Sequence, residues 1–151
     1  MNRLLVNLYK NQLLTIRRGK GIVGKSNAKI FLLLALIDCV EYGWLKENHF
    51  HFEMELLGST YDELFEYYQE VGYVPIHVPF YHLGSADFYH LHWHDVKQTS
   101  NKWHTPSAKY LREHLLYAEF DEELWILLQE KESRDFLKQS IVEYYLTPST
   151  I

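Results

Sequence analysis

The chain has 151 residues, 47% of them hydrophobic, which suits one domain with one core. Seven glycines and four prolines argue against a disordered or fibrous chain, and a single cysteine, Cys39, excludes an internal disulfide. The net charge of −5 taken alone argues against a nucleic-acid partner.

The N-terminal residues carry no long apolar stretch of the kind found in signal peptides. The longest apolar run, residues 30–37, is too short to span a membrane. We therefore expect a cytoplasmic protein with no membrane partner.

The charges are unevenly distributed along the chain. All 20 acidic residues lie from Asp38 onward. Residues 1–29 contain only basic charges: Arg3, Lys10, Arg17, Arg18, Lys20, Lys25 and Lys29. A segment of one sign on an acidic body predicts a local anionic partner, and a polyanion such as DNA fits. A solvated, solubilising segment is the alternative interpretation.

The first half of the chain begins with two predicted helices. Apolar spacing predicts a helix over residues 2–16, followed by a flexible basic loop over 17–25. Residues 27–42 are apolar nearly all round, which is typical of a central buried helix. Residues 49–55 alternate like a strand, and Thr60 to Glu63 forms a capping box that predicts a helix to about residue 71.

The second half mixes strand and helix patterns. Two prolines make residues 74–80 an edge strand or a shaped loop, and residues 88–93 predict a strand. Helices are expected from Thr105-Pro106 to about residue 117, from Asp121 through 128, and from Ser133 to about 146.

The order of these elements predicts an α+β fold rather than alternating β and α units. We expect a helical domain with a small central β-sheet or hairpin and a helical C-terminal half. The sequence contains no repeat or linker, so residues 1–151 are interpreted as a single domain.

The start of the central helix, residues 24–29, has two lysines and Ser26 where acidic residues are usual. Such a helix start favours a bound anion, as phosphates elsewhere show. A Ser or Asn cap with solvated lysines is the alternative. The glycine spacing does not fit a Walker A motif.

Three histidines, His90, His92 and His94, alternate along a predicted strand and so share one face. This spacing suits metal ligands, and His49 and His51 offer a second pair. One hypothesis is therefore a metal-dependent enzyme, and a solvated strand face is the alternative.

The segment from Lys97 to Arg112 interleaves cations with polar and aromatic side chains. This mixture suits phosphate contacts combined with base or sugar packing, and a polar surface loop is the alternative. The candidate ligands here are Lys97, Lys102, His104, Ser107 and Lys109.

Catalytic motifs are missing from the sequence. There is no Gly-x-Ser-x-Gly elbow, and Cys39 lies within an apolar helical run. We expect a non-catalytic chain without a cofactor.

Two motifs carry a resemblance to a known family. Residues 25–38 resemble the Pro-His-Lys-Pro motif and Leu-rich helix of DNA sulfur-binding domains, which occur beside HNH nucleases in modification-dependent restriction enzymes. Residues 78–83, Val-Pro-Phe-Tyr-His-Leu, followed by 88–91, resemble that family's Tyr-Pro-Phe-x-x-Leu and following strand. Residues 107–111, 117–121 and 124–128 also fit, so the likeness covers about 25–146, after a basic N-terminal helix and loop over 1–24.

The resemblance implies binding to duplex DNA that carries a backbone phosphorothioate, as part of a bacterial restriction system. Pro79 would be the pocket proline and Lys29 the family lysine. The sequence departs from the family at Ala28, Val78 and His82, where histidine, tyrosine and a small residue are usual. The implied sulfur pocket consists of Val78, Pro79, Tyr81, His82 and His104. The residues implied to bind DNA phosphates are Arg17, Arg18, Lys20, Lys25, Ser26, Lys29, Lys97, Lys102, Ser107 and Lys109.

The resulting hypothesis is a recognition module that works with a nuclease on the same or another chain. Two alternatives from other classes stay open. One is the metal-dependent enzyme using His90, His92 and His94, and the other is a protein-interaction module with an aromatic surface.

Overall fold

The computed structural model describes residues 1–22, 24–94 and 105–146, and Lys97, Lys102 and His104 lie outside them. The described residues form seven α-helices and a two-stranded sheet, which confirms the α+β prediction. In chain order the elements are α1 (Arg3–Leu13), α2 (Ala28–Glu41), α3 (Glu55–Tyr67), α4 (His77–His82), the 3₁₀ turn η1 (Leu83–Ser85), β1 (Tyr89–Trp93), α5 (Ala108–His114), β2 (Leu115–Phe120), α6 (Glu122–Gln129), α7 (Lys131–Ile141) and the π-helical turn η2 (Val142–Leu146).

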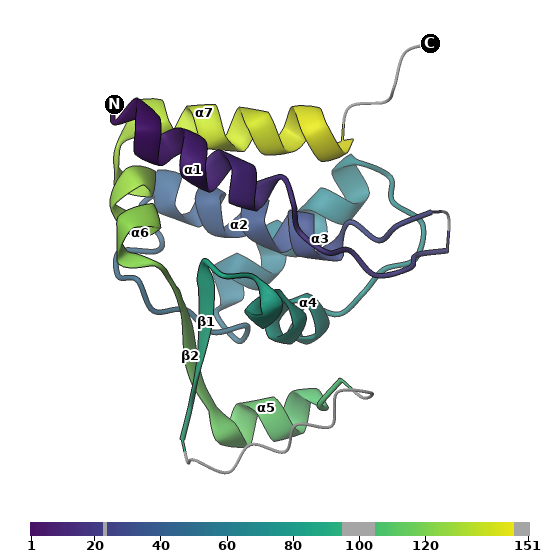
Figure 1. Ribbon diagram of the computed structural model, residues 1–151. Helices are drawn as coiled ribbons and strands as arrows, with labels where there is room; N and C mark the ends of the chain where they lie inside the picture. Colours follow the sequence, from purple (N-terminus) through teal and green to yellow (C-terminus); the bar gives the residue numbers. More distant parts are fainter. Residues whose placement is uncertain (23, 95–104, 147–151) are drawn as a thin grey trace.

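Helix α2 forms the centre of the core. Eleven of its 14 residues are buried, and they lie on every side of the helix. Helices α3, α4, α6 and α7 all contact α2, while α1 lies alongside α7 (Figure 1). The predicted buried helix over residues 27–42 is confirmed, because only a helix surrounded by other elements can be apolar all round.

The sheet is an antiparallel ribbon made of β1 and β2. Leu91 lies opposite Ala118, and the register shifts between His92 and Trp93. Ala118 also exchanges two backbone hydrogen bonds with Phe50, at 2.9 and 2.8 Å. The prediction of a strand over residues 49–55 is therefore wrong, since only Phe50 forms a β-bridge there. The helix expected to continue to residue 117 ends at His114, where β2 begins.

The expected start of a helix at Thr60 and the expected edge strand or loop over residues 74–80 are also wrong. Helix α3 begins at Glu55, so Thr60 lies inside it, and the Thr60 hydroxyl donates to the Leu56 carbonyl at 2.7 Å instead of capping. The stretch with two prolines is helical from His77. Pro79 is tolerated there because it occupies the first turn, where backbone N–H groups have no partner within the helix.

The remaining helices follow the sequence signals with small shifts. Ser107, not Thr105, caps α5, and its Oγ accepts a hydrogen bond from the Tyr110 N–H at 3.1 Å. Helix α6 starts directly after Asp121, as predicted. No helix in the described part of the chain is long and apolar enough to cross a membrane.

The burial of α2 predicts where truncation destabilises the fold. Leu33 is 1% exposed, so Leu33→Ala should lower the free energy of unfolding by about 2–5 kcal/mol through lost contacts and a cavity. Leu4 is 85% exposed, and Leu4→Ala should change it by less than about 0.5 kcal/mol. Urea denaturation measures both, and equal effects would contradict the assignment of α2 as the core.

Candidate nucleic-acid interface

An open cavity of about 470 Å³, here called the basic cavity, lies between the loop after α1 and helix α4. Eight residues selected from the sequence meet around it: Arg17, Arg18, Lys20, Ser26, Lys29, Val78, Pro79 and His82. Gly19, Ala28 and Val74 complete its lining. Segments that are more than 40 residues apart in the chain thus form one site.

The two sides of the basic cavity differ in chemistry. The loop and the start of α2 supply Arg17, Lys20 and Lys29, whereas the α4 side supplies the apolar side chains of Val78 and Pro79. Pro79 is buried in the fold although it lines the cavity. A ligand here meets fixed positive charge on one side and a dry, rigid wall on the other.

Backbone hydrogen bonds join the described residues of the basic loop into a turn. Lys20 and Lys25 form a β-bridge, and the Ser26 N–H donates to the Gly19 carbonyl at 2.8 Å. Gly24 has a φ of 76°, which glycine adopts without strain. The loop therefore presents its cations from a defined backbone.

Arg18 is fixed by two partners from distant segments. Its Nη1 donates to Asn27 Oδ1 at 2.8 Å, and its guanidinium lies 5.0 Å from the centre of the Tyr145 ring. The Tyr145 hydroxyl donates to the Leu13 carbonyl at 2.6 Å and accepts from the Ile16 N–H at 3.2 Å. Tyr145 in η2 thus ties the end of α1 to the basic loop. Sequence reasoning missed this role, for which the aromatic end of the last helix was the only signal.

The start of α2 already has an anion, and it comes from the chain itself. The Glu70 carboxylate accepts hydrogen bonds from the Asn27 N–H at 2.9 Å and from Asn27 Nδ2 at 2.8 Å. The expectation that this helix start favours an anion is met by Glu70, so a bound phosphate is not needed there. The cations of the loop are left to face the cavity.

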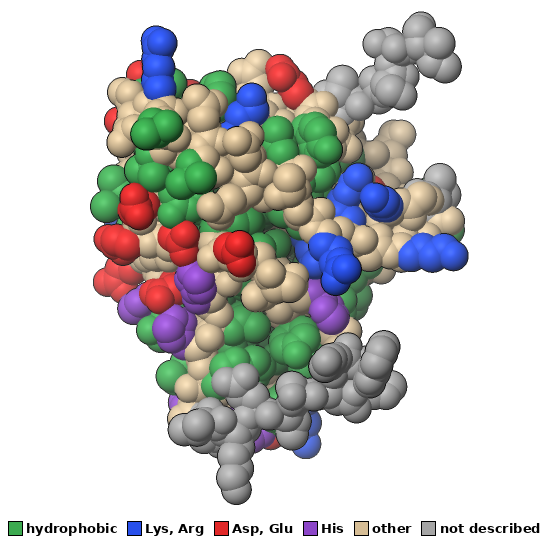
Figure 2. Space-filling model, viewed as in Figure 1, with side chains coloured by type: hydrophobic (Ala, Val, Ile, Leu, Met, Phe, Trp, Pro, Cys, Tyr) green, Lys and Arg blue, Asp and Glu red, His purple; other side chains and the backbone are tan. Residues whose placement is uncertain are grey.

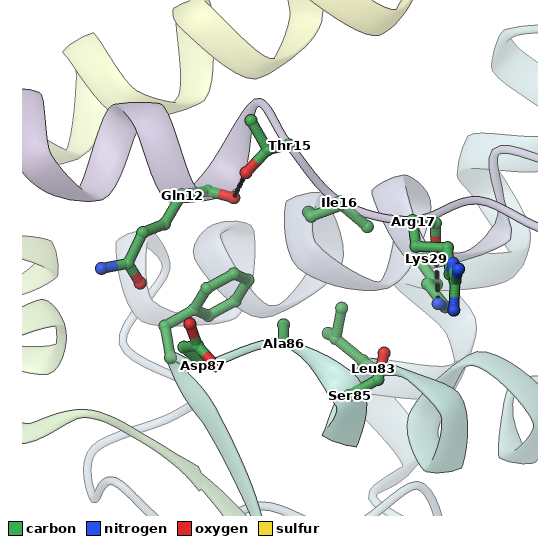
Figure 3. A pocket seen from close by; sticks show the side chains of 10 residues that line it. Gln12, Thr15, Ile16, Arg17, Lys29, Leu83, Ser85, Ala86 and Asp87 are labelled. Atoms are coloured by element: carbon green, nitrogen blue, oxygen red, sulfur yellow. Dashed lines mark hydrogen bonds between the residues drawn. The ribbon is translucent and has the colours of Figure 1, made fainter.

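Lys29 and His82 have lowered pKa values. Burial, followed by the charge of Arg17, lowers the pKa of Lys29, whose Nζ donates to the Arg17 carbonyl at 2.6 Å (Figure 3). Burial and the charge of Lys29 lower the pKa of His82. His82 Nε2 lies 2.7 Å from Thr105 Oγ1. Burial is thus the main cause of both lowered pKa values, and a neighbouring cation adds to each.

The surface cations near the site lack acidic partners. Among described residues, Arg17, Lys20, Lys25 and Lys109 form no ion pair, whereas Lys131 and Lys138 on α7 pair with Asp135 and Asp38 at 2.8 and 2.6 Å. Figure 2 shows the blue side chains gathered on the right, on the side of the loop between α1 and α2, and red ones gathered on the left. The net charge of −5 therefore hides a separation of charge.

A second, smaller cavity of about 170 Å³ adjoins the basic cavity, and Arg17 and Lys29 line both (Figure 3). It is enclosed by the end of α1 and by residues 83–88. Gln12 lines it too, and Gln12 Oε1 is buried without a hydrogen-bond partner in the described structure. Arg17 and Lys29 thus form a ridge with a hollow on either side.

Several candidate residues lie away from the basic cavity. Tyr81 lines a different cavity together with Trp93, and Lys25 is exposed on the turn of the loop. Ser107 caps α5, and Lys109 is exposed on the same helix. The pocket predicted from sequence is therefore only partly assembled.

Two of the three candidate histidines, His90 and His92, pair with carboxylates, and the structure shows no side-chain partner for His94 among the described residues. His90 pairs with Asp121, and His92 Nε2 lies 2.8 Å from Glu119 Oε1. Within residues 1–22, 24–94 and 105–146, no group of three or more His, Cys, Asp or Glu is placed to hold a metal ion. The geometry gives the metal hypothesis no support.

Cys39 is not placed to act as a nucleophile. Its side chain is buried in the core, and this burial raises the pKa of the thiol to about 11.

Comparison with known proteins finds a likeness in structure only. No family model and no curated protein matches the sequence. A solved structure titled "Sulfur binding domain and SRA domain of ScoMcrA complexed with phosphorothioated DNA" matches with a TM-score of 0.70 and 16% identity. The match covers 91% of this chain and 42% of that chain. The resemblance to DNA sulfur-binding domains is thus confirmed at the level of the fold.

The Glu70–Asn27 contact predicts a second stability effect. Glu70→Gln removes the charge that two Asn27 donors share, so it should lower the free energy of unfolding by about 1–2 kcal/mol. Glu66→Gln, an exposed change in the last turn of α3, is the matched control and should change the free energy of unfolding by less than about 0.5 kcal/mol. Thermal and urea unfolding measure both, and an unaffected Glu70→Gln protein would refute the role of Glu70 as the anchor of α2.

Proposed function

We propose that the chain binds duplex DNA through the basic cavity and recognises a phosphorothioate linkage in the DNA backbone. The observation that carries this proposal is the convergence of unpaired cations and an apolar wall around one open cavity. Phosphate contacts would position the duplex, and the cavity would discriminate between oxygen and sulfur.

Affinity is assigned to the basic loop. Arg17 and Lys20 line the cavity without acidic partners among the described residues, so a DNA phosphate would replace only water and counterions. Lys25 extends the same charge along the turn. Such contacts make binding sensitive to salt.

Selectivity is assigned to the apolar side of the cavity. Sulfur is larger and less hydrated than a phosphate oxygen. Removing sulfur from water to place it against Val74, Val78 and Pro79 therefore costs less free energy than removing an oxygen would. Lys29 and Arg17 would balance the charge of the linkage. Support also comes from the shared fold, because the matched structure is titled as a complex with phosphorothioated DNA.

We further infer that the chain is one recognition domain without catalytic activity, and that it serves a bacterial restriction or defence system in the cytoplasm. The resemblance of residues 25–146 to domains found beside HNH nucleases supports this role. The chain spans less than half of the matched chain, which carries a second domain. A nuclease on the same natural chain or on a partner would perform the cleavage.

Charge reversal in the loop tests the proposed surface. Arg17→Glu with Lys20→Glu should weaken binding to a phosphorothioate duplex at least about tenfold and reduce the slope of log affinity against log salt by about one per lost contact. Fluorescence anisotropy at two salt concentrations measures both quantities. Lys131→Glu, on α7, is the control and should bind like the original chain. Unchanged affinity of the double variant would refute this surface.

Binding should also strengthen as the pH falls. Burial and the charge of Lys29 lower the pKa of His82 in the free chain, and a bound phosphate would raise it, so binding takes up a proton between these two pKa values. Affinity should rise by at most about tenfold per pH unit as the pH falls from the pKa of His82 in the complex to its lowered pKa in the free chain. His82→Gln should lose this part of the pH dependence, and His49→Gln should keep it. An identical pH profile for His82→Gln would contradict the role of His82.

A further inference from the structure

A third cavity, of about 490 Å³ and here called the aromatic cavity, lies between α4 and β1. It shares His82 with the basic cavity and Ser85 with the smaller cavity of Figure 3. The aromatic cavity is therefore a neighbour of both other cavities. The lining residues that matter here are Tyr81, Gly84, Leu91 and Trp93.

The aromatic cavity is rigidly built. Tyr89, fully buried beneath it, donates from its hydroxyl to the Phe80 carbonyl at 2.8 Å and so ties β1 to α4. Gly84 approaches β1 so closely that an added Cβ would lie 2.8 Å from Leu91 Cδ1. Tyr81 and Trp93 meet edge to face, with ring centres 6.3 Å apart. The aromatic wall is formed before any ligand arrives.

The polar ends of the two aromatic residues have no hydrogen-bond partner among the described residues. Tyr81 and Trp93 are half-buried, and neither the Tyr81 hydroxyl nor the Trp93 indole N–H forms a hydrogen bond to another described residue. Each side chain thus offers an apolar ring and an unused donor. Rings of this kind pack on sugars and base edges while the donor binds an acceptor.

Charge decides which part of a nucleic acid fits the aromatic cavity. No Lys or Arg belongs to its described lining, and at one end His90 is paired with Asp121. A phosphate would gain little there and would meet the carboxylate of Asp121. The cations of the basic cavity hold phosphate on the other side of His82. An uncharged base and sugar are therefore the parts that fit the aromatic cavity.

We propose that Tyr81 and Trp93 contact the base and deoxyribose of the nucleotide next to the phosphate held in the basic cavity. The aromatic cavity then sets the preference for the base pair that flanks the modified linkage. This inference rests on the proposed function, since it needs the DNA backbone to lie in the basic cavity.

The test uses a set of duplexes with one phosphorothioate at a fixed position and all four base pairs on either side of it. Fluorescence anisotropy gives the affinity of the original chain, Tyr81→Ala, Trp93→Ala and Arg17→Ala for each duplex. The original chain should prefer some flanking base pairs. We define the spread as the ratio of its affinities for the tightest-bound and the weakest-bound duplex of the set. Each aromatic variant should reduce this spread about tenfold. Arg17→Ala should weaken binding to every duplex by a similar factor, because it contacts the backbone alone.

Tyr81→Phe and Trp93→Phe keep the aromatic ring and remove the donor, so they remain informative if the alanine variants do not fold. At least one of them should narrow the spread at an unchanged melting temperature. A flat profile for the original chain, or an unchanged spread in every folded Tyr81 and Trp93 variant, would overturn this inference and leave DNA binding intact. If the original chain binds no duplex, the proposed function itself fails.

Discussion

The burial of α2 on all sides is the constraint that places the site. A helix with no exposed face can reach the surface only at its ends, and here its N-terminal end does so between the basic loop and α4. Glu70 holds that end by accepting two hydrogen bonds from Asn27, and Asn27 in turn accepts one from Arg18. The same contacts that complete the first turn of α2 therefore also hold Arg18, one of the cations that line the cavity.

Charge separation reconciles an acidic chain with an anionic ligand. The cations Lys131, Arg134 and Lys138 of α7 pair with carboxylates, whereas the cations of the basic loop form no ion pair among the described residues. A local field, rather than the net charge of −5, governs what binds at one face. In the proposed function, the apolar side of the cavity would add a preference that charge alone does not provide.

The sequence predicted what depends on local pattern and composition. The buried helix at 27–42, the strand at 88–93 and the cation-rich N-terminal segment follow from periodicity and charge. Contacts between distant residues could not be predicted this way: Glu70 lies 43 positions from Asn27, and Tyr145 lies 129 from Ile16. Strand β2 was missed because its first residues were predicted to continue the preceding helix, and pairing with β1 outweighs that local helical preference. The resemblance grouped Tyr81 with the pocket, whereas the helical period of α4 puts Val78, Pro79 and His82 on the side of the basic cavity and Tyr81 in a different cavity.

Sulfur recognition by an apolar wall beside fixed cations is the central claim, and one comparison of affinities tests it most directly. The same short duplex is prepared unmodified and with a single phosphorothioate in each of its two diastereomers, and its binding to the chain is measured at one salt concentration. The account predicts that one diastereomer binds more tightly than both the other diastereomer and the unmodified duplex, because only one orients sulfur toward Val78 and Pro79. Equal affinity for all three duplexes would contradict it.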